Sequence, residues 1–153
     1  MRTFFIFFAL TVIFSACAHK SAFEDFNITK EQALSEDVIQ SSKIQTEDKV
    51  IGIVSAIYLN KVRAKKYKDN EFFYISLYIK KEYSQDVNFL LNNKKPIKVE
   101  KLNAKNEFIS LTSSKAQWLR YYKLVFPKES NLLRLEVKSK EGSSGKMIFK
   151  KEE

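Results

Sequence analysis

The sequence predicts an all-β fold in which two antiparallel sheets pack face to face, with a β-barrel as the alternative. About seven or eight segments alternate apolar and polar residues at intervals of roughly 10 to 15 residues, without long helices between them. The 13 Phe and 7 Tyr residues favour strands, and the 44% hydrophobic content is typical of a globular protein. With 153 residues, the chain is long enough for one domain with a core. Because each strand has one apolar face, a second sheet is the simplest way to bury it.

Residues 1–16 have the organisation of a secretory signal peptide. Arg2 precedes an apolar stretch over residues 4–14, and two small residues then lead to Cys17. The stretch is shorter than the roughly 20 apolar residues that a membrane-spanning helix needs. We therefore expect residues 1–16 to be removed during export.

The segment Phe14-Ser15-Ala16-Cys17 resembles the lipobox of bacterial lipoproteins, with Phe14 where Leu is usual. The resemblance implies that Cys17 carries a diacylglycerol and, after cleavage, an N-acyl chain such as palmitate. Two or more acyl chains hold a protein firmly at a membrane, since each buried methylene contributes about 0.8 kcal/mol. Ala18 follows the cysteine, which in that family implies the outer membrane. The mature chain keeps 18 acids and all basic residues except Arg2, and it has no second cysteine for a disulfide.

Residues 17–43 are expected to form the lipidated Cys17, a polar tether and a short helix. Thr29 is suited to cap a helix over residues 29–43, because Gln32 follows three residues later. The apolar stripe of this helix is narrow, so we expect it to lie on the domain or to hold the domain off the membrane. The β domain is expected to span residues 44–153.

The first two predicted strands cover residues 49–62 and 71–82. The first strand is apolar on both faces, which predicts a central position in the sheet, and Gly52 is placed to form a bulge. The second strand alternates cleanly. Its expected inward side chains are Phe73, Ile75, Leu77 and Ile79.

The remaining strands are predicted from shorter patterns. Residues 87–93 and 95–102 predict a hairpin around Asn93 and Lys94, and residues 107–114 predict a short strand. Strands over residues 117–127, 131–140 and 146–151 are expected to bury alternate apolar side chains. These are Trp118, Tyr122, Leu124, Phe126, Leu133, Leu135, Val137, Met147 and Phe149.

In length, lipobox and strand spacing, the whole chain resembles the small immunoglobulin-like lipoproteins of epsilonproteobacterial envelopes. The resemblance implies an immunoglobulin-like β-sandwich. The Cys…Trp…Cys signature of antibody-type domains is absent, because Cys17 is the only cysteine.

The sequence lacks the groups that most enzymes use. His19 is the only histidine and lies two residues from Cys17, so no imidazole base is available in the folded domain for a Ser or Cys nucleophile. A zinc site would need several His or Cys ligands, and no pattern pairs two carboxylates as a glycosidase requires. With only 3 Gly there is no phosphate-binding loop. We expect no catalysis, no metal, no cofactor other than the lipid on Cys17, and no small-molecule substrate.

Two groups of residues are candidates for binding. Phe72, Tyr74 and Tyr78 project from the outward face of their strand, where they form a partner surface unless the helix or another sheet covers them. A basic segment at residues 60–70 is a candidate anion contact, with solubility as the alternative. Its cations are Lys61, Arg63, Lys65, Lys66 and Lys68.

These features predict an outer-membrane lipoprotein of the cell envelope that acts by binding, as an adhesion or envelope-scaffold module. The partners expected are the membrane, through the lipid anchor, and an envelope or host protein. Nucleic acid is not expected, because an exported domain rarely meets it. The alternatives are an accessory lipoprotein of a secretion or envelope complex, and a binder of anionic lipid or lipopolysaccharide through the basic loops.

Overall fold

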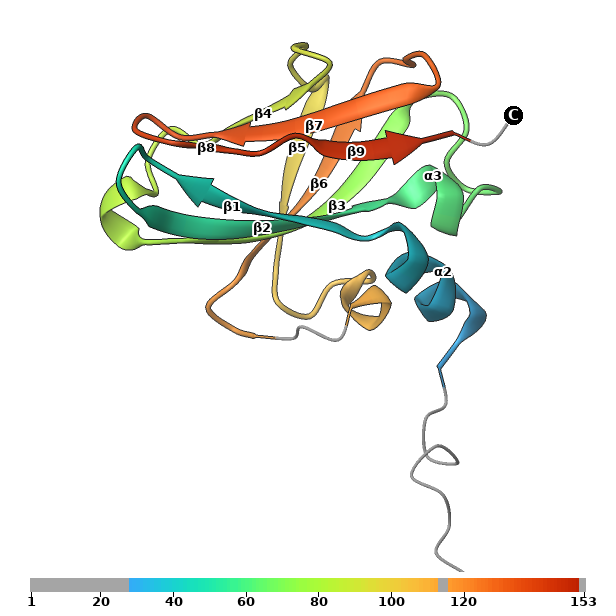
Figure 1. The fold of residues 1–153 in the computed structure, drawn as a ribbon. Coiled ribbons are helices and arrows are strands. Elements are labelled where there is room, and N and C mark those ends of the chain that lie inside the picture. Colours follow the sequence, from blue (N-terminus) through green and yellow to red (C-terminus); the bar gives the residue numbers. More distant parts are fainter. Residues whose placement is uncertain (1–27, 113–115, 152–153) are drawn as a thin grey trace, which may run out of the picture.

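The computed structural model describes residues 28–112 and 116–151, which form a strongly curved β-sheet with short helices at one end (Figure 1). The predicted signal peptide and Cys17 lie outside the described residues. The helices are α2 (Lys30–Val38) and α3 (Leu59–Val62), and the 3₁₀ turns are η2 (Lys81–Tyr83) and η3 (Ile109–Leu111). The strands are β1 (Gln40–Gln45), β2 (Val50–Tyr58), β3 (Glu71–Ile79), β4 (Asn88–Leu91), β5 (Lys98–Leu102), β6 (Arg120–Phe126), β7 (Leu132–Lys138), β8 (Ser143–Ser144) and β9 (Met147–Lys150).

Within the described residues, backbone hydrogen bonds join nine strands into one antiparallel sheet in the order β4-β7-β8-β1-β2-β3-β6-β5, and β9 also pairs with β7. The sheet bends into a half-barrel, so β7 and β9 lie over β2 and β3 (Figure 1). The two-residue β8 pairs with β1 on one side and with β7 on the other, which connects the two layers. The predicted all-β fold is confirmed, but the immunoglobulin-like arrangement of two sheets is not.

The concave side of the half-barrel holds the larger hydrophobic core. The inward side chains predicted for β3 are all buried there, with Phe73 fully enclosed. The Phe73 ring meets Phe126 and Phe149 with centroids 6.0 and 5.2 Å apart. The predicted inward residues of β7 and β9 also lie in this core. Each such side chain stabilises the fold by about 1.5–3 kcal/mol when it is fully buried.

A bulge in β2 lies where the sequence predicts one. Ile44 pairs with Gly52 and Gln45 pairs with Val50, so Ile51 is an extra residue in its strand. The extra residue turns the Ile51 side chain into the concave core, where it is fully buried. Gly52 is required here because a Cβ atom at this position would lie 2.5 Å from the carbonyl oxygen of Tyr78.

The predicted hairpin around Asn93 is wrong. β4 pairs with β7, whereas β5 pairs with β6 at the opposite edge of the sheet. Asn92 and Asn93 have positive φ angles of 48° and 66°, which turn the chain sharply after β4. The Asn92 side chain then attaches this turn to β7, because its amide donates to Leu132 O and its oxygen accepts from Arg134 N.

Two element predictions near the outer face also need correction. In the described part of the predicted strand, residues 107–112, η3 forms instead of a strand. α2 is capped by the Thr29 hydroxyl as predicted, but it ends at Val38 rather than near residue 43.

β1 begins at Gln40, before residue 44, where the sequence places the start of the β domain. The pattern did not reveal β1 because Ile44 is its only apolar residue.

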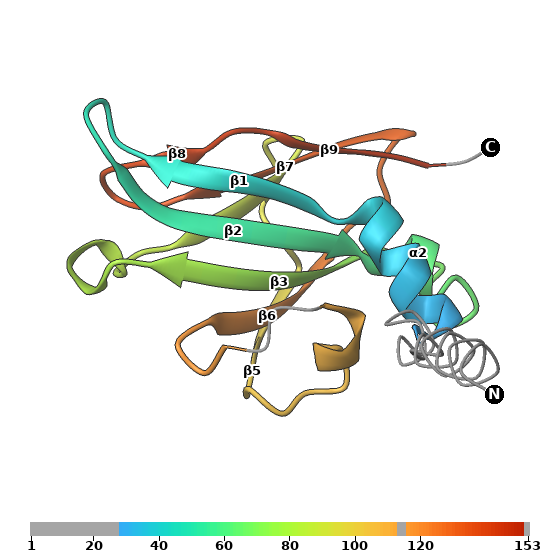
Figure 2. The ribbon, with the colours of Figure 1, turned by 60° about the horizontal axis from the view of Figure 1, so that its bottom comes forward.

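A second hydrophobic cluster lies on the convex side of the sheet, where α2 and the segment around η3 lie beside β2, β3 and β6 (Figure 2). Ile57, Tyr74 and Tyr121 face outward from the three strands and are 2%, 1% and 1% exposed. Phe108 covers Tyr74 with their ring centroids 5.3 Å apart. Burial raises the pKa of Tyr74 to about 12, so its hydroxyl stays neutral under ordinary conditions. No helix in the described part of the chain is both long enough and apolar enough to span a bilayer.

Candidate functional site

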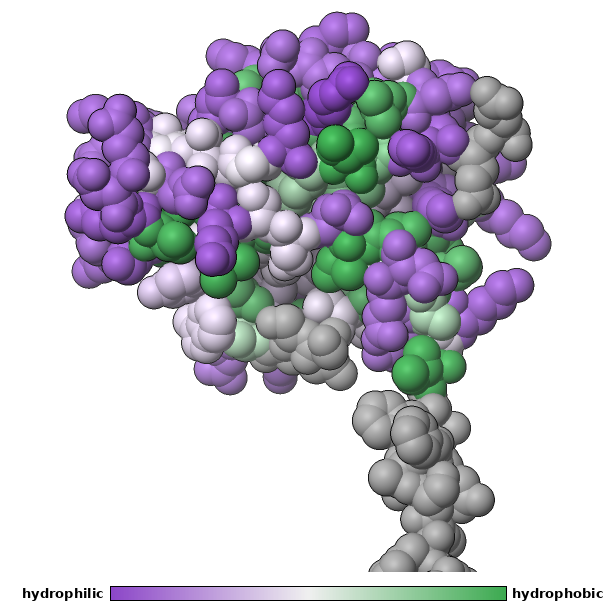
Figure 3. Space-filling model, viewed as in Figure 1, coloured by the Kyte–Doolittle hydropathy of each residue, from purple (hydrophilic) through white to green (hydrophobic). Residues whose placement is uncertain are grey.

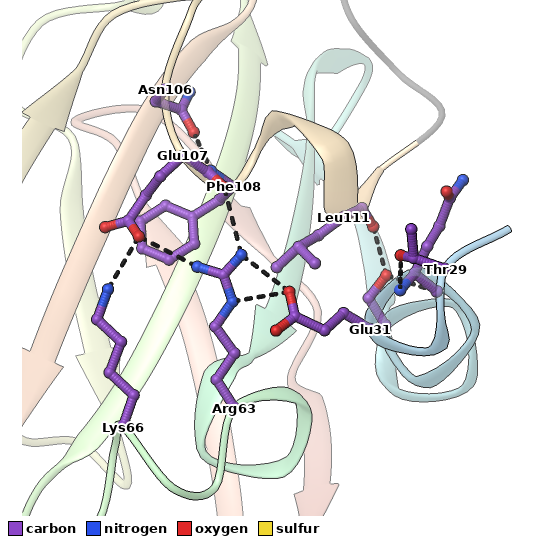
Figure 4. Close-up of polar contacts among 10 residues, drawn as sticks. Thr29, Glu31, Arg63, Lys66, Asn106, Glu107, Phe108 and Leu111 are labelled. Atoms are coloured by element: carbon purple, nitrogen blue, oxygen red, sulfur yellow. Dashed lines mark hydrogen bonds and ion pairs between the residues drawn. The ribbon is translucent and has the colours of Figure 1, made fainter.

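Arg63, one of the predicted anion contacts, binds carboxylates of its own chain (Figure 4). Its Nε and Nη2 donate to Oε2 of Glu31 on α2 at 3.1 and 3.0 Å, and Nη1 donates to Oε2 of Glu107 at 3.1 Å. The guanidinium also lies over the Phe108 ring, 5.2 Å from its centroid. Arg63 therefore ties α2 and the segment before η3 to α3.

Lys66 takes part in the same ion-pair cluster. Its Nζ lies 2.9 Å from Glu107 Oε2. This hydrogen bond, helped by the charge of Arg63, holds the pKa of Glu107 below its usual value. Arg63 and Lys66 are thus paired with carboxylates of the segments that cover the second hydrophobic cluster. The hydroxyl of buried Ser35 on α2 also donates to Leu111 O of η3, which joins these two covering segments directly.

Lys61 and Lys68 lie elsewhere, in the wall of a pocket of about 350 Å³. We call it the lysine pocket. The structure brings together side chains that are far apart in the sequence, from the end of β2, α3, the following loop, the start of β3, the loop after β6 and the end of β9. They are Tyr58, Asn60, Lys61, Ala64, Tyr67, Lys68, Glu71, Lys128, Lys150 and Lys151. Lys65, the remaining predicted contact, is exposed and does not line the pocket.

A buried carboxylate lies in the wall of the lysine pocket. Glu71 is 1% exposed and accepts hydrogen bonds from the Tyr58 hydroxyl at 2.6 Å, from Glu129 N at 2.9 Å and from Lys151 Nζ. Burial together with this hydrogen bond raises the pKa of Tyr58 above its usual range, so Tyr58 remains a neutral donor. Because Glu71 already accepts three hydrogen bonds, its carboxylate oxygens are bonded within the chain and are not available to a ligand.

The loop that carries Lys68 is held in place by polar contacts. Asn60 donates from Nδ2 to Asn70 O at 2.6 Å and accepts from Phe72 N at 2.8 Å, which closes the loop between α3 and β3. The Tyr67 ring packs on the Phe72 ring, with their centroids 4.5 Å apart. The Tyr67 hydroxyl is buried and has no hydrogen-bond partner among the described residues. It is an unused donor in a pocket wall.

A second candidate surface is an open part of the convex sheet face. Ile53, Tyr78 and Trp118 are 50%, 38% and 66% exposed, and we call them the apolar patch. The Tyr78 and Trp118 rings meet edge to face, with centroids 5.3 Å apart and an interplanar angle of 86°. They line a hollow of about 640 Å³ together with two serines, Ser55 and Ser76.

The structure separates the three aromatic residues that the sequence places on a partner surface. Tyr78 is exposed as the partner-surface prediction requires. Tyr74 is not available to a partner, because Phe108 and Tyr121 cover it, and Phe72 is half-buried against Tyr67. The expectation that Trp118 is buried is wrong, because β6 begins at Arg120 and Trp118 lies outside the alternation of that strand.

No group of three or more His, Cys, Asp or Glu in the described ranges could hold a metal ion. His19 lies outside the described residues. The chain matches no protein-family model, and comparisons with curated proteins and with solved structures found no match.

Proposed function

We propose that this chain is a lipid-anchored protein of the bacterial cell envelope, at the outer membrane, whose β domain binds a protein partner and performs no catalysis. The lipobox-like segment ending at Cys17 supports the anchor. The role is that of an adhesion or envelope-scaffold module, with an envelope or host protein as the partner. We include in the proposal an immunoglobulin-like arrangement of the two layers, supported by β7 and β9 crossing over β2 and β3.

The observation that carries the binding role is the apolar patch. On β2, β3 and β6, the part of the convex face near Ile57, Tyr74 and Tyr121 is covered by α2, α3 and η3. Ile53, Tyr78 and Trp118 are large apolar side chains that the described residues leave open. An aromatic side chain held on a strand, such as Tyr78 on β3, is an efficient anchor for a protein partner, because little conformational entropy is lost when it is covered. The hydroxyls of Ser55 and Ser76 offer hydrogen bonds in the same hollow.

A photo-crosslinking experiment in intact cells tests this role. A photoreactive phenylalanine analogue replaces Tyr78, and the same analogue replaces exposed Lys101 on β5 as the control. We expect a defined crosslinked protein from position 78 that is absent from position 101 and is lost when Trp118→Ala is added. Identical products from both positions, or no product from position 78, would contradict the proposal.

The anchor has a separate test. Mass spectrometry of the purified mature protein should find an N-terminal residue 17 with the mass of a diacylglycerol and an acyl chain, and Cys17→Ser should release the protein from the membrane fraction. An unmodified thiol or a retained signal peptide would contradict the anchor while leaving the crosslinking result untouched.

A second candidate function, binding of anionic lipid or lipopolysaccharide, is favoured by the position of Lys61 and Lys68 in a pocket wall. Only part of the basic segment at residues 60–70 can serve this function, because Arg63 and Lys66 bind carboxylates of the same chain.

A further inference from the structure

We propose that the lysine pocket is a binding site for a phosphate-bearing anion, of the phosphomonoester or diphosphate class. The proposal rests on the second candidate function, for which it names the ligand class and the site, and it does not depend on the protein partner.

The pocket carries a strong excess of positive charge. The lysines in its wall are Lys61, Lys68, Lys128, Lys150 and Lys151, while Glu71 is the one carboxylate among the described lining residues. Glu71 bonds to Lys151, and no carboxylate of the described residues forms an ion pair with Lys68, Lys128 or Lys150. Ammonium groups gathered around one hollow repel each other, and a bound anion relieves that repulsion.

The backbone holds these lysines in fixed places rather than on one loose loop. Lys150 is paired with Leu132 in the β7–β9 ladder, and Lys151 N donates to Asn131 O at 3.0 Å. Lys61 belongs to α3. The positive charges therefore converge from segments separated by about ninety residues of chain, and the fold sets their spacing.

The lining favours phosphate over other ligands. Lysine ammonium groups bind phosphate oxygens as point charges with several donors. A cation is excluded by the charge of the wall. A volume of about 350 Å³ holds more than a single phosphate group, which is why a diphosphate or an esterified phosphate fits the site.

The position of the pocket suggests two sources for this chemistry. α2, α3 and the end of β9 lie at one end of the domain, and hydrophilic side chains extend from it (Figures 1 and 3). The described part of the chain begins at this end, at Ile28. If the proposed anchor at Cys17 is correct, a membrane with lipid phosphates is one source of this chemistry, and a free phosphate compound is the other.

Pyrophosphate binding provides the direct test. Residues 28–151 contain every described strand and both hydrophobic clusters, so a chain starting at residue 17 with Cys17→Ser keeps the whole core. Isothermal titration at constant ionic strength compares this chain with two variants of equal net charge. Lys68→Gln with Lys150→Gln alters the pocket, whereas Lys95→Gln with Lys105→Gln alters exposed lysines outside it.

We expect the pocket variant to bind pyrophosphate about 10-fold more weakly or not at all, and the control variant to change the affinity by less than about 2-fold. Absence of pyrophosphate binding by the parent chain, or an equal loss in both variants, would overturn the proposal. Unfolding curves of both variants show whether the fold is kept.

A vesicle experiment distinguishes the two sources. The same chain is mixed with phosphatidylcholine vesicles that contain or lack phosphatidic acid, whose headgroup is a phosphomonoester. Binding that requires phosphatidic acid, and that pyrophosphate competes away, supports a lipid source. Pyrophosphate binding without vesicle binding supports a free anion. Both outcomes are independent of Trp118 and of acylation, so they remain informative if the protein-partner proposal fails.

Discussion

The two halves of the convex sheet face use similar residues in opposite ways. Toward α2, Ile57 and Tyr74 are paired across β2 and β3 and are almost completely buried. Four residues along the same strands, about 13 Å away, Ile53 and Tyr78 form the same kind of pair but remain open to solvent. An outward apolar stripe on a strand therefore has no single meaning. Its role depends on whether another part of the chain covers it.

The buried half is covered by two segments that are far apart in the sequence. α2 precedes β1, and η3 lies between β5 and β6. Arg63 joins the two segments through Glu31 and Glu107. None of these segments extends over the apolar patch. The covered half therefore contributes to stability, and the open half is free to contact a partner.

The largest expected difference between the halves comes from truncating one ring in each. Phe108→Ala should destabilise the protein by about 3–5 kcal/mol, because it leaves a cavity over Tyr74. Trp118→Ala removes a larger ring but should cost less than about 1 kcal/mol, since two thirds of that side chain is exposed. Urea denaturation followed by circular dichroism measures both. An equal loss of unfolding free energy in both variants would contradict the assignment of a covered and an open half.

Removing the link between the covering segments should have a smaller effect. Arg63→Met keeps much of the side-chain volume but deletes the hydrogen bonds to Glu31 and Glu107, and we expect a loss of about 1–3 kcal/mol. Hydrogen exchange should become faster in α2 and around η3, while the ends of β2 and β3 near Ile53 and Tyr78 remain unchanged. Lys65→Met, at an exposed position nearby, is the control. Uniformly faster exchange would show that Arg63 supports the whole domain instead.

Acid should weaken the covered half through the same ion pairs. The pKa of Glu107 is lowered in the folded protein, mainly by the hydrogen bond from Lys66. Its contribution to the free energy of unfolding is therefore fully present above the unfolded pKa of about 4.3. That contribution is lost as the pH falls through the lower folded pKa. Because Glu107 is half exposed, we expect less than about 1 kcal/mol. The difference in unfolding free energy between the parent and Glu107→Gln should shrink from pH 7 to pH 3, and a constant difference would contradict this assignment.

The smallest effect on stability is expected in the apolar patch itself. Ile53→Ser should change the free energy of unfolding by no more than about 0.5 kcal/mol, because half of the side chain is exposed. It should nevertheless reduce crosslinking from position 78. Trp118 is the only tryptophan, so its emission gives a direct measure of cover at this site. Exposed emission in the free protein should shift to shorter wavelength when the partner is added.

Local patterns predicted the parts of the fold that depend on local geometry. The alternation in β3 correctly separated its inward residues from Phe72, Tyr74 and Tyr78, because side chains on a strand alternate with a period of two residues. The choice of pairing partner is not local. β4 and β5 are close in the sequence and look like a hairpin, but they end at opposite edges of the sheet. Which outward residues η3 would cover could not be predicted from β3 alone.

The candidate site shows the same limit. A basic segment could be recognised between residues 60 and 70, but not its division between the Arg63 cluster and the lysine pocket. That division depends on the turn of α3 and on carboxylates from distant segments. Lys128, Lys150 and Lys151 carried no signal, because only the fold brings them beside Lys68.

If the proposed anchor at Cys17 is correct, the position of β1 determines how the domain responds to tension. The chain reaches the sheet through α2 and then β1, so tension between a membrane anchor and a held β domain acts first on the contacts of Arg63 with Glu31. If α2 detaches, β1 is next in line. It is held by six residue pairs with β2 and by β8 through Ile44 and Ser144, which attach it to both layers. The helix can therefore yield under force while the sheet that carries the apolar patch stays intact.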